Sequence, residues 1–560
     1  MEIKTKQINE KLLQDLNKEL GLDLVSLRIL INRGYDTPEK INRFVNFNKK
    51  NLRDVNTLKD VNPFMNTLIS SIKSKEEITI YGDYDCDGIM ATYIWVSALR
   101  KLNIKTNYFI NNRFTEGYGM NIKGVDRLLN KFPNTKLIIT CDNGIAAKEG
   151  VEYCTAKNLK VIISDHHNEN INNKILNKNI PVVCEGRLDE EKASKEYFTG
   201  AELSRRLVSE LYSRLNIKNK NINYLKSLCA YSGFTIISDS VPMTPANHYI
   251  AKMGIKAMNM FKDYPIWNFL QDNSDNPIDE NTIGFTFAPM FNAVSRLSGE
   301  CDECIELLLT DNLEKQKELL EEMKSFNSMR KTITQDYFSA ITESLENSRA
   351  LIISSNAPEG ILGILSGRLV EKYNKPSIVF TPVEDNPNLL KGSARSPEDV
   401  DIYSVLLECN DLLENFGGHK LACGLTIKKE NLQKLKDHFE VALKNRCSNK
   451  STKYVDFDLK TKDITYDFIE QLNFLAPYGN DFAAPDISLT FIPKKIDVMK
   501  SLHVKIEQDE LKILHFSCID KNKNPYKKDK IVKVTGHPCI NYFKNEKFKQ
   551  FIIDTCDNVY

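Results

Sequence analysis

Short apolar runs alternate with longer amphipathic stretches between residues 76 and 245. Four of these runs are EITIY (77–81), KLIIT (136–140), KVIIS (160–164) and TIIS (235–238). A strand that is buried on both faces of a parallel sheet is apolar along its whole length. We therefore predict a parallel sheet here, with helices between its strands.

An acidic residue follows each of these four runs, namely Asp83, Asp142, Asp165 and Asp239. The carboxyl ends of the strands line the ligand crevice of an open parallel sheet. We therefore expect four acidic turns to converge at one edge of this sheet.

The N-terminal part has a different pattern. Residues 1–75 contain short amphipathic stretches at helical spacing, interrupted at Gly34–Pro38, where Thr37 can cap a helix that begins at Pro38. This pattern predicts a helical segment, and no chemistry is apparent in it.

The C-terminal half predicts three further parts. A long charged helical pattern, typical of a connecting helix, is followed by strand patterns with glycine-rich turns and then by alternating strands that predict a small barrel. The fold class is thus α/β, with a parallel-sheet domain and a second α/β domain joined by a long helix, and a C-terminal β-barrel. The predicted domains are 1–75, 76–245, 246–345, 346–447 and 448–560.

Composition narrows the class of protein. A chain of 560 residues is too long for one hydrophobic core, and its 76 Lys and Arg nearly balance 75 Asp and Glu. Any site for a polyanion must therefore be local. The thirteen cysteines are scattered, which favours a reduced protein. The N-terminus has no signal-type apolar core, which favours a cytoplasmic location. We expect no membrane span, because the chain has no apolar run of ~18–20 residues.

The first acidic turn carries three alternating aspartates, Asp83, Asp85 and Asp87, before Gly88. Alternate residues of an extended segment point the same way, so their carboxylates can reach a common cation. Two other interpretations stay open, an ordinary Asp-Gly turn and a calcium-type loop.

The later turns add Asp142, the pair His166 and His167, and Asp239. Oxygen ligands with one or two imidazoles and no thiolate set suit Mn²⁺ or Mg²⁺ better than structural zinc. So many carboxylates repel one another unless cations neutralise them. Two ions are the simplest solution, and a two-metal site is suited to in-line phosphoryl displacement.

The series GDYDCDG, TCDNG, SDHH and SDSVP resembles, in order and spacing, the motifs of the DHH phosphoesterases. Later segments are similar to those of the bacterial RecJ exonucleases, so the resemblance covers nearly the whole chain. These segments are RFTEGYG (113–119), FAPMFNAVSRL (287–297), EGILGILSGRL (359–369), GSARS (392–396) and FGGHKLACGL (416–425).

The resemblance implies a role for each matching residue. The implied metal ligands of a two-ion centre are Asp85, Asp87, Asp142, His166 and Asp239, and Asp83 and His167 occupy catalytic positions that support or complete it. Arg113, Arg296, Ser393 and Arg395 match residues that hold a terminal 5′ phosphate, with Asn292 and Ser396 as further substrate-binding positions. Gly417, Gly418 and His419 match the GGH motif of a DHHA1 domain that faces the metals across the substrate cleft.

The C-terminal strands resemble the OB-fold of such enzymes. Lys494–Tyr560 contains 14 Lys against 9 acidic residues, with Tyr526, Tyr542, Phe543 and Phe548 among them. This composition suits a groove that follows phosphates while bases stack on aromatic rings. A lysine-rich barrel surface over core aromatics is the alternative.

Three segments depart from the family pattern. The chain has VVCEGRLDEE and later FTGAEL where the family has an Asn-Pro and a CGAG-like turn, and NAVSR replaces an NAAGR-like segment beside Arg296. No metal-ligand position is lost, so the departures concern the substrate cleft and suggest a divergent member.

The resemblance implies a 5′-to-3′ exonuclease that hydrolyses terminal phosphodiesters of single-stranded DNA with two Mn²⁺ or Mg²⁺ ions in DNA repair or recombination. A helicase or a single-strand-binding protein is the implied partner of a monomeric enzyme. Two alternatives stay open. One is a DHH enzyme for short oligonucleotides or cyclic dinucleotides, and the other is a non-catalytic replication scaffold of the same fold, which lacks metal ligands.

Overall fold

The computed structural model describes residues 2–169, 175, 179–190, 195–260, 267, 276–342, 348–384, 386–444, 452–516, 518–519, 524–544 and 546–559. It consists of two compact units. The first contains Met1–Asn111, Tyr118–Ala288 and Ser451–Tyr560, and the second contains Asn112–Gly117 and Pro289–Lys450.

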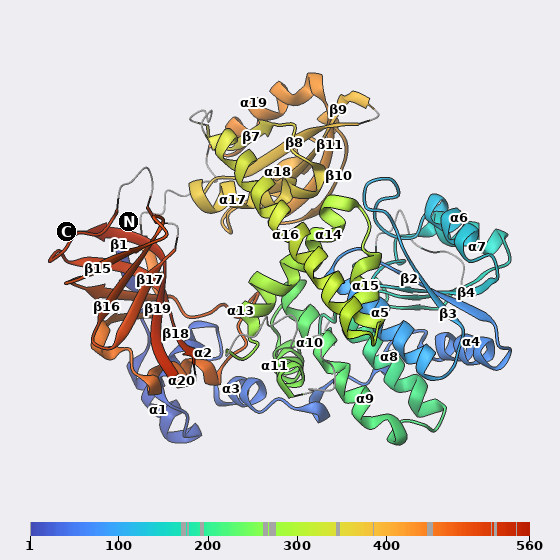
Figure 1. Cartoon of the computed structure of the whole chain (residues 1–560), viewed down its shortest axis with the longest axis horizontal. Helices are drawn as coiled ribbons and strands as arrows, with labels where there is room; N and C mark the ends of the chain where they lie inside the picture. The colour runs from blue at the N-terminus through green and yellow to red at the C-terminus, as the bar shows by residue number, and fades with distance from the viewer. Residues whose placement is uncertain are drawn as a thin grey trace. The chain divides into compact units, whose positions relative to one another are not determined.

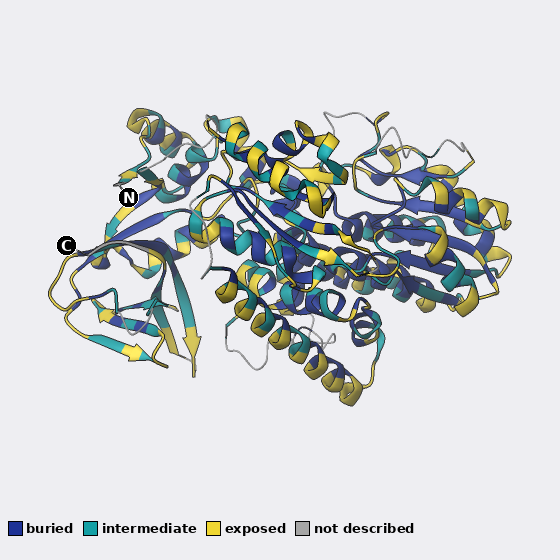
Figure 2. Cartoon of the chain, turned by 90° about the horizontal axis from the view of Figure 1, so that it is seen from above, coloured by how far each residue is buried: buried dark blue, intermediate teal, exposed yellow. Residues whose placement is uncertain are grey.

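The parallel sheet predicted for the first unit is present. Its five strands run in the order β3-β2-β4-β5-β6, and every pair is parallel. They are β2 (Glu77–Gly82), β3 (Thr106–Ile110), β4 (Thr135–Cys141), β5 (Lys160–Ser164) and β6 (Val182–Val183). The interior of this sheet is buried, as the dark blue strands on the right of Figure 2 show.

Helices cover both faces of this sheet. In Figure 1, α6 and α7 lie on one side of it, and α4 and α8 lie on the other. The helices that follow the strands are α5 (Cys86–Lys101), α6 (Ile122–Lys131), α7 (Lys148–Ala156) and α8 (Gly200–Arg214). Each strand therefore ends at a turn that leads away from the same edge.

The fourth apolar run is not a strand, which corrects our prediction. Residues 235–238 form the end of helix α10 (Cys229–Ser238), and Asp239 is its C-terminal cap. This helix is buried on nearly all sides, and a short run that is apolar on every side cannot be assigned to strand or helix by periodicity alone. Around it lie α9 (Ile222–Ser227), α11 (Pro245–Met260), α13 (Glu280–Thr282) and a π-helix at Ile283–Phe287.

The N-terminal segment is mostly helical, as predicted. Its helices are α1 (Glu10–Leu20), α2 (Leu24–Asn32), α3 (Pro38–Val45) and α4 (Val61–Lys73). Thr37 caps α3 by accepting the N–H of Lys40, and Pro38 is its first residue. The first residues were wrongly expected to be helical. They form β1 (Glu2–Thr5), because their backbone pairs in parallel with the distant strand β12 (Thr452–Val455).

The C-terminal region forms the expected OB-fold sheet, with strand order β13-β14-β18-β19-β17-β16-β15. The strands are β13 (Phe457–Lys460), β14 (Ile487–Phe491), β15 (Ile496–Met499), β16 (His503–Gln508), β17 (Leu511–His515), β18 (Val532–Phe543) and β19 (Glu546–Val559), and α20 (Tyr466–Phe474) precedes β14. Their core is continuous with α1, α2 and α3. Asp456, whose side chain is fully buried, pairs with Arg33 at 2.7 Å and with Lys6 at 3.1 Å, which joins the N-terminal segment to the start of the C-terminal region.

The second unit is the predicted second α/β domain with the long helix before it. Its sheet has the order β10-β11-β9-β8-β7. The strands are β7 (Leu351–Ser354), β8 (Ser377–Val383), β9 (Asn386–Arg395), β10 (Leu413–His419) and β11 (Ala422–Lys428). The helices are α14 (Ala288–Ser298), α15 (Asp302–Leu309), α16 (Leu313–Thr342), α17 (Leu362–Tyr373), α18 (Ile402–Leu407) and α19 (Leu432–Ala442).

Among the residues that the structure describes, every helix is too short or too polar to cross a membrane.

Candidate metal centre and phosphate-binding residues

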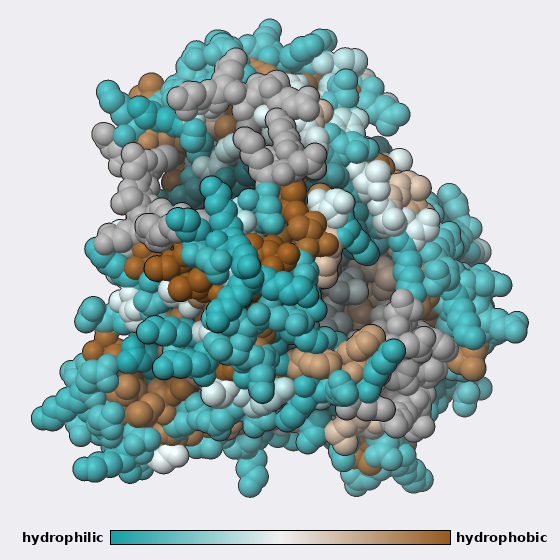
Figure 3. All heavy atoms as spheres, turned by 60° about the vertical axis from the view of Figure 1, so that its left-hand side comes forward, coloured by the Kyte–Doolittle hydropathy of each residue, from teal (hydrophilic) through white to brown (hydrophobic). Residues whose placement is uncertain are grey.

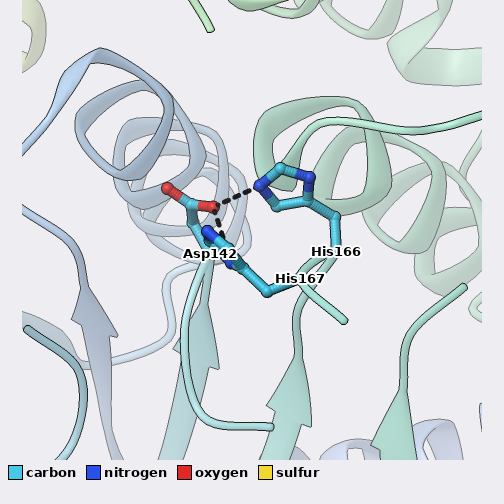
Figure 4. Close-up of side chains that lie close together, drawn as sticks. All are labelled: Asp142, His166 and His167. Atoms are coloured by element: carbon cyan, nitrogen blue, oxygen red, sulfur yellow. Dashed lines mark ion pairs between the residues drawn. The ribbon is translucent and has the colours of Figure 1, made fainter. Parts of the chain in front are cut away.

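The acidic cluster stands at the carboxyl edge of the parallel sheet. Asp83 follows β2, Asp85 caps the N-terminus of α5, and Asp87 lies in the first turn of that helix. Asp142 follows β4, and the two histidines follow β5, as Figure 4 shows for Asp142, His166 and His167. Asp239 joins them from the end of α10.

The structure brings all seven predicted residues of the centre into sets that could hold a cation. The ligand atoms of each set lie within 4.8 Å of one another. The sets are Asp83, Asp85 and Asp142; Asp142, His166 and His167; and Asp87, His166 and Asp239. The first and the last share no residue, so there are ligands for two separate ions.

This division differs from the expectation that the three alternating aspartates serve one cation. Helix α5 begins at Cys86, so Asp87 does not continue an extended segment with Asp83 and Asp85. Because successive helical residues turn about the helix axis, Asp87 faces His166 and Asp239 instead.

The Asp85 carboxylate is fixed by its position at the start of α5. Its Oδ1 accepts the N–H of Asp87 at 3.0 Å and the N–H of Gly88 at 3.1 Å. A Cβ on Gly88 would lie 2.5 Å from the carbonyl oxygen of Asp83, so a side chain there would push the loop away. The glycine of the DxDxDG series therefore allows the close return of the chain.

The N-terminus of α8 holds Asp87. The N–H groups of Gly200 and Ala201 donate to its two carboxylate oxygens, the second at 2.9 Å. Two backbone donors at a helix N-terminus stabilise an anion, here one that is only 1% exposed. These donors belong to FTGAEL, one of the segments that departs from the family pattern.

Asp142 occupies a tight position. Its φ of 62° is left-handed, its side chain is buried, and its Oδ1 lies 3.0 Å from Nε2 of His166. That oxygen accepts no hydrogen bond from the described residues. A buried carboxylate oxygen with imidazole beside it and no hydrogen-bond donor fits a metal ligand.

Burial and mutual repulsion keep these carboxylates from ionising together. Burial raises the pKa of Asp142, and the charge of Asp87 raises it further. Burial likewise raises the pKa of Asp239, again with Asp87 as the largest repulsive charge. Divalent cations would relieve this repulsion, so the donor set fits two hard ions.

The two histidines have opposite environments. Burial and the neighbouring His167 lower the pKa of His166, which keeps its ring neutral and able to ligate a cation. Burial also acts to lower the pKa of His167, but Asp165 outweighs it and raises that pKa to about 9. Nδ1 of His167 lies 2.8 Å from Oδ1 of Asp165 and 3.0 Å from the hydroxyl of Tyr118.

Sequence reasoning missed these supporting residues. Asp165 was expected only as one of the four acidic turns at the sheet edge, and no role was predicted for Tyr118 of the RFTEGYG segment. Oδ2 of Asp165 accepts the N–H of Ile145 at 2.9 Å, so the carboxylate orients His167 from a fixed position. An acidic residue directly before two histidines at a strand end was the signal available.

The second unit brings several predicted phosphate-binding residues together. Nη1 of Arg296 donates to the carbonyl of Gly360 at 3.0 Å, just before α17. Arg395 comes close to the same helix start, because a Cβ on Gly363 would lie 2.9 Å from its Nη2. Arg113 donates its backbone N–H to Gly299, three residues after Arg296, and Asn292 lies one turn before Arg296 on α14.

Arg395 has the environment of an anion-binding group. Its Nη1 donates to Oγ of Ser393 at 3.1 Å, and burial lowers the pKa of the guanidinium. Within the described ranges no carboxylate forms an ion pair with it. A desolvated guanidinium beside a helix N-terminus is suited to a phosphate.

The register of the second sheet adds the GGH motif. Ser393 pairs with Gly424, which pairs with Gly417, and Arg395 pairs with Ala422, which pairs with His419. Directly paired residues share a face of a sheet, so Ser393, Arg395, Gly417 and His419 lie on one face.

Gly418 and Ser396 have other neighbours. Gly418 has a φ of 145°, and a Cβ there would clash with the carbonyl oxygen of Ala422. Ser396 donates its hydroxyl to the carbonyl of Val400 at 2.7 Å. It lies just after the last residue of β9 and is buried.

The proposed aromatic groove of the C-terminal strands is only partly available. Tyr526 is 4% exposed and belongs to the core, which corrects its assignment as a stacking residue. Phe548 is covered by Lys512, whose Nζ lies 3.3 Å from the ring centroid. Tyr542 and Phe543, at the tip of the β18–β19 hairpin, are exposed. Two lysines of this lysine-rich region, Lys521 and Lys523, lie outside the described residues.

Family models match three segments of the chain. The N-terminal domain of the DHH family matches residues 77–233, the DHHA1 domain matches 346–445, and the RecJ OB domain matches 455–555.

Known proteins resemble almost the whole chain. The single-stranded-DNA-specific exonuclease RecJ of Bacillus subtilis (strain 168) is 26% identical over 562 residues, which cover 96% of this chain and 69% of the relative. The protein of that name from Escherichia coli (strain K12) is 26% identical over 490 residues, 82% of each chain.

Among solved structures, RecJ from Thermus thermophilus in complex with Mn²⁺ aligns with a TM-score of 0.79 at 20% identity, over 100% of this chain and 79% of that one. This likeness concerns the fold. With the three matched domains in this order, the chain belongs to the DHH/DHHA1 phosphoesterase superfamily as a RecJ-like member with an OB-fold domain.

Proposed function

We propose that this protein is an exonuclease that hydrolyses terminal phosphodiesters of single-stranded DNA in the 5′-to-3′ direction, with two Mn²⁺ or Mg²⁺ ions. The observation that carries the proposal is the pair of ligand sets without a shared residue at the sheet edge. Relatives that bear the name of a single-stranded-DNA-specific exonuclease support the substrate.

The chain's own residues would divide the work as follows. Asp83, Asp85 and Asp142 would hold one ion, and Asp87, His166 and Asp239 would hold the other. Two such ions would activate a water molecule and offset the charge that develops on the phosphate oxygens. His167 is held by Asp165 and Tyr118, so its imidazolium is the candidate to donate a proton to the leaving oxygen.

The second unit supplies the contacts that select the end of the strand. Arg113, Arg296, Ser393 and Arg395 are proposed to hold the 5′ phosphate, with Asn292 and Ser396 supporting them. Gly417, Gly418 and His419 are proposed to approach the strand closely, since glycines expose backbone N–H groups.

The OB-fold strands are proposed to bind the rest of the strand. Figure 3 turns this side of Figure 1 forward and shows a largely hydrophilic face with separate hydrophobic patches. Tyr542 and Phe543 are exposed aromatics at the tip of the β18–β19 hairpin, and Lys544 and Lys547 are exposed in the same hairpin. Stacking rings and lysines together suit a single strand of any sequence.

An assay with end-labelled oligonucleotides and Mn²⁺ tests the proposal. We expect release of nucleotides from the 5′ end of single-stranded DNA, faster with a 5′ phosphate. Preferential attack on duplex or on 3′ ends would contradict the strand and polarity claims. RNA of the same sequence, run in parallel, decides between DNA and RNA as the substrate.

The remaining assignments are proposals of the same kind. We propose that the enzyme works in the cytoplasm as a monomer in DNA repair or recombination, on strands opened by a helicase or coated by a single-strand-binding protein. We also propose domain boundaries near residues 75, 245, 345 and 447, the last two of which lie outside the described residues. Limited proteolysis with mass measurement of the fragments checks the boundaries.

A further inference from the structure

A small cavity lies beside the metal centre within the first unit. Its volume is about 290 Å³, and its walls include Ser238, Ser240, Glu280, Phe285 and Tyr478. Cavities that bind small ligands measure ~300–1,000 Å³. This one is at the lower limit, so it suits a single flat ring system.

The cavity adjoins the metal centre through Asp239. Ser238 and Ser240 flank this residue in sequence and line the cavity, whereas Oδ2 of Asp239 lies 3.9 Å from Nε2 of His166. Consecutive Cα atoms are ~3.8 Å apart, so the wall of the cavity begins one residue away from a candidate metal ligand.

The chemistry of the walls favours a neutral ring over a phosphate. Among the described residues that line the cavity there is no Lys or Arg, and Glu280 would repel an anion. Ser240, which is exposed, can bond through its hydroxyl to the polar edge of a base. Asn281, also in the wall, is an exposed amide that can do the same.

Two aromatic rings border this polar set. Phe285 is 78% exposed, an unusual state for a large apolar side chain, and it stands on the π-helix Ile283–Phe287. Single-turn π segments often occur at functional sites. Tyr478 stacks on Phe482 with ring centroids 5.6 Å apart and planes at 10°, so its ring has a fixed orientation.

The walls are fastened to one another. Nδ2 of Asn480 donates to the carbonyl of Ser240 at 2.9 Å, and the N–H of Met243 donates to the carbonyl of Asn480 at 2.8 Å. Oε1 of Glu280 accepts the N–H of Tyr478 at 3.2 Å. A cavity held from three segments is formed before a ligand arrives, which lowers the entropy cost of binding.

We propose that this cavity binds one nucleobase of the single-stranded substrate, next to the phosphate at the metal centre, with Phe285 stacking on the base. The inference rests on the proposed function, because the ligand is a nucleotide of the strand held for cleavage. It deepens that function by giving the strand a fixed position for one base.

Binding of abasic oligonucleotides tests the proposal. A series of 5′-phosphorylated strands with cleavage-resistant phosphorothioate linkages, each with one abasic nucleotide at a different position, is measured by fluorescence anisotropy in Mn²⁺, so that the metal centre is loaded. We expect one position near the 5′ end at which the abasic nucleotide weakens binding about tenfold, the usual effect of losing one stacked base. The same position should have no effect in Phe285→Ala.

Phe474→Ala is the matched control, since Phe474 is 43% exposed on α20, outside the cavity. It should keep the wild-type pattern. A scan without a sensitive position, a sensitive position that persists in Phe285→Ala, or one that Phe474→Ala also removes would overturn the proposal. Cleavage in Mn²⁺ is measured separately, so a protein that binds in this pattern without cleaving refutes the nuclease function and leaves the cavity assignment standing.

Discussion

Replacement of Gly200 by alanine should lower cleavage about 100-fold and change stability little. A Cβ here would lie 2.5 Å from the Cβ of Asp142 and 2.9 Å from its Cα. Carbon atoms in contact are ~3.5–4.0 Å apart, so one of the two backbones must move by about 1 Å. A displacement of that size at reacting groups costs ~100-fold in rate.

The same change disturbs both ligand sets. Asp142 belongs to the first set, and the N–H of Gly200 donates to Asp87, which belongs to the other. Overpacking costs ~1–3 kcal/mol. Alanine is better than glycine in a helix by ~1 kcal/mol, which offsets part of that cost. The net change is small beside a typical stability of ~5–15 kcal/mol, so the variant should fold.

The assay compares cleavage of a 5′-phosphorylated strand, Mn²⁺ affinity by calorimetry and thermal unfolding. Gly367→Ala is the matched control, because a Cβ there would meet no atom within 4 Å. It should cleave like the wild type. A Gly200→Ala variant with wild-type cleavage and Mn²⁺ affinity would refute the reasoning that this close approach fixes the two carboxylates.

Four other substitutions test separate parts of the geometry. Asp142→Asn should abolish cleavage and raise the melting temperature in EDTA, because a buried, repelled carboxylate is removed; a lower melting temperature would contradict this. Arg395→Gln should reduce the preference for a 5′ phosphate over a 5′ hydroxyl by roughly 10–100-fold in competition binding. This is the contribution expected of one hydrogen bond to a charged group. Lys547→Gln should reduce the slope of log affinity against log salt concentration by about 0.7 for single-stranded DNA, because one phosphate contact is lost. An unchanged slope would mean that the strand does not contact Lys547. Burial lowers the pKa of His248 from its usual 6.5 to about 4 in the folded protein. The free energy of unfolding should therefore fall by ~3 kcal/mol as the pH drops from about 6.5 to 4, because the unfolded chain binds the proton first. Acid unfolding monitored by circular dichroism should show a smaller fall in His248→Gln.

Local pattern was sufficient for much of the fold. Strands β2, β4 and β5 were predicted correctly because buried parallel strands are continuously apolar. The helix cap at Thr37 was predicted correctly because a capping side chain and a proline at the first helical position are both signals within one helical turn. The prediction of a strand at 235–238 was wrong because a helix that is buried on every side has the same short apolar pattern as a buried strand. Strand β1 was not predicted because its partner, β12, lies far away in the sequence.

The sequence alone determined the chemistry of the candidate site. Carboxylates and imidazoles directly after apolar strands indicate hard divalent ions, since the carboxyl ends of parallel strands share one edge. Only the tertiary structure decided how those groups divide into two ligand sets, that Asp239 arrives from a helix, and that Gly200 and Ala201 hold Asp87. Likewise, strand register alone brings Ser393 and Arg395 to the face of Gly417 and His419. Periodicity acts over a few residues, whereas these contacts join segments whose meeting depends on how the whole chain packs.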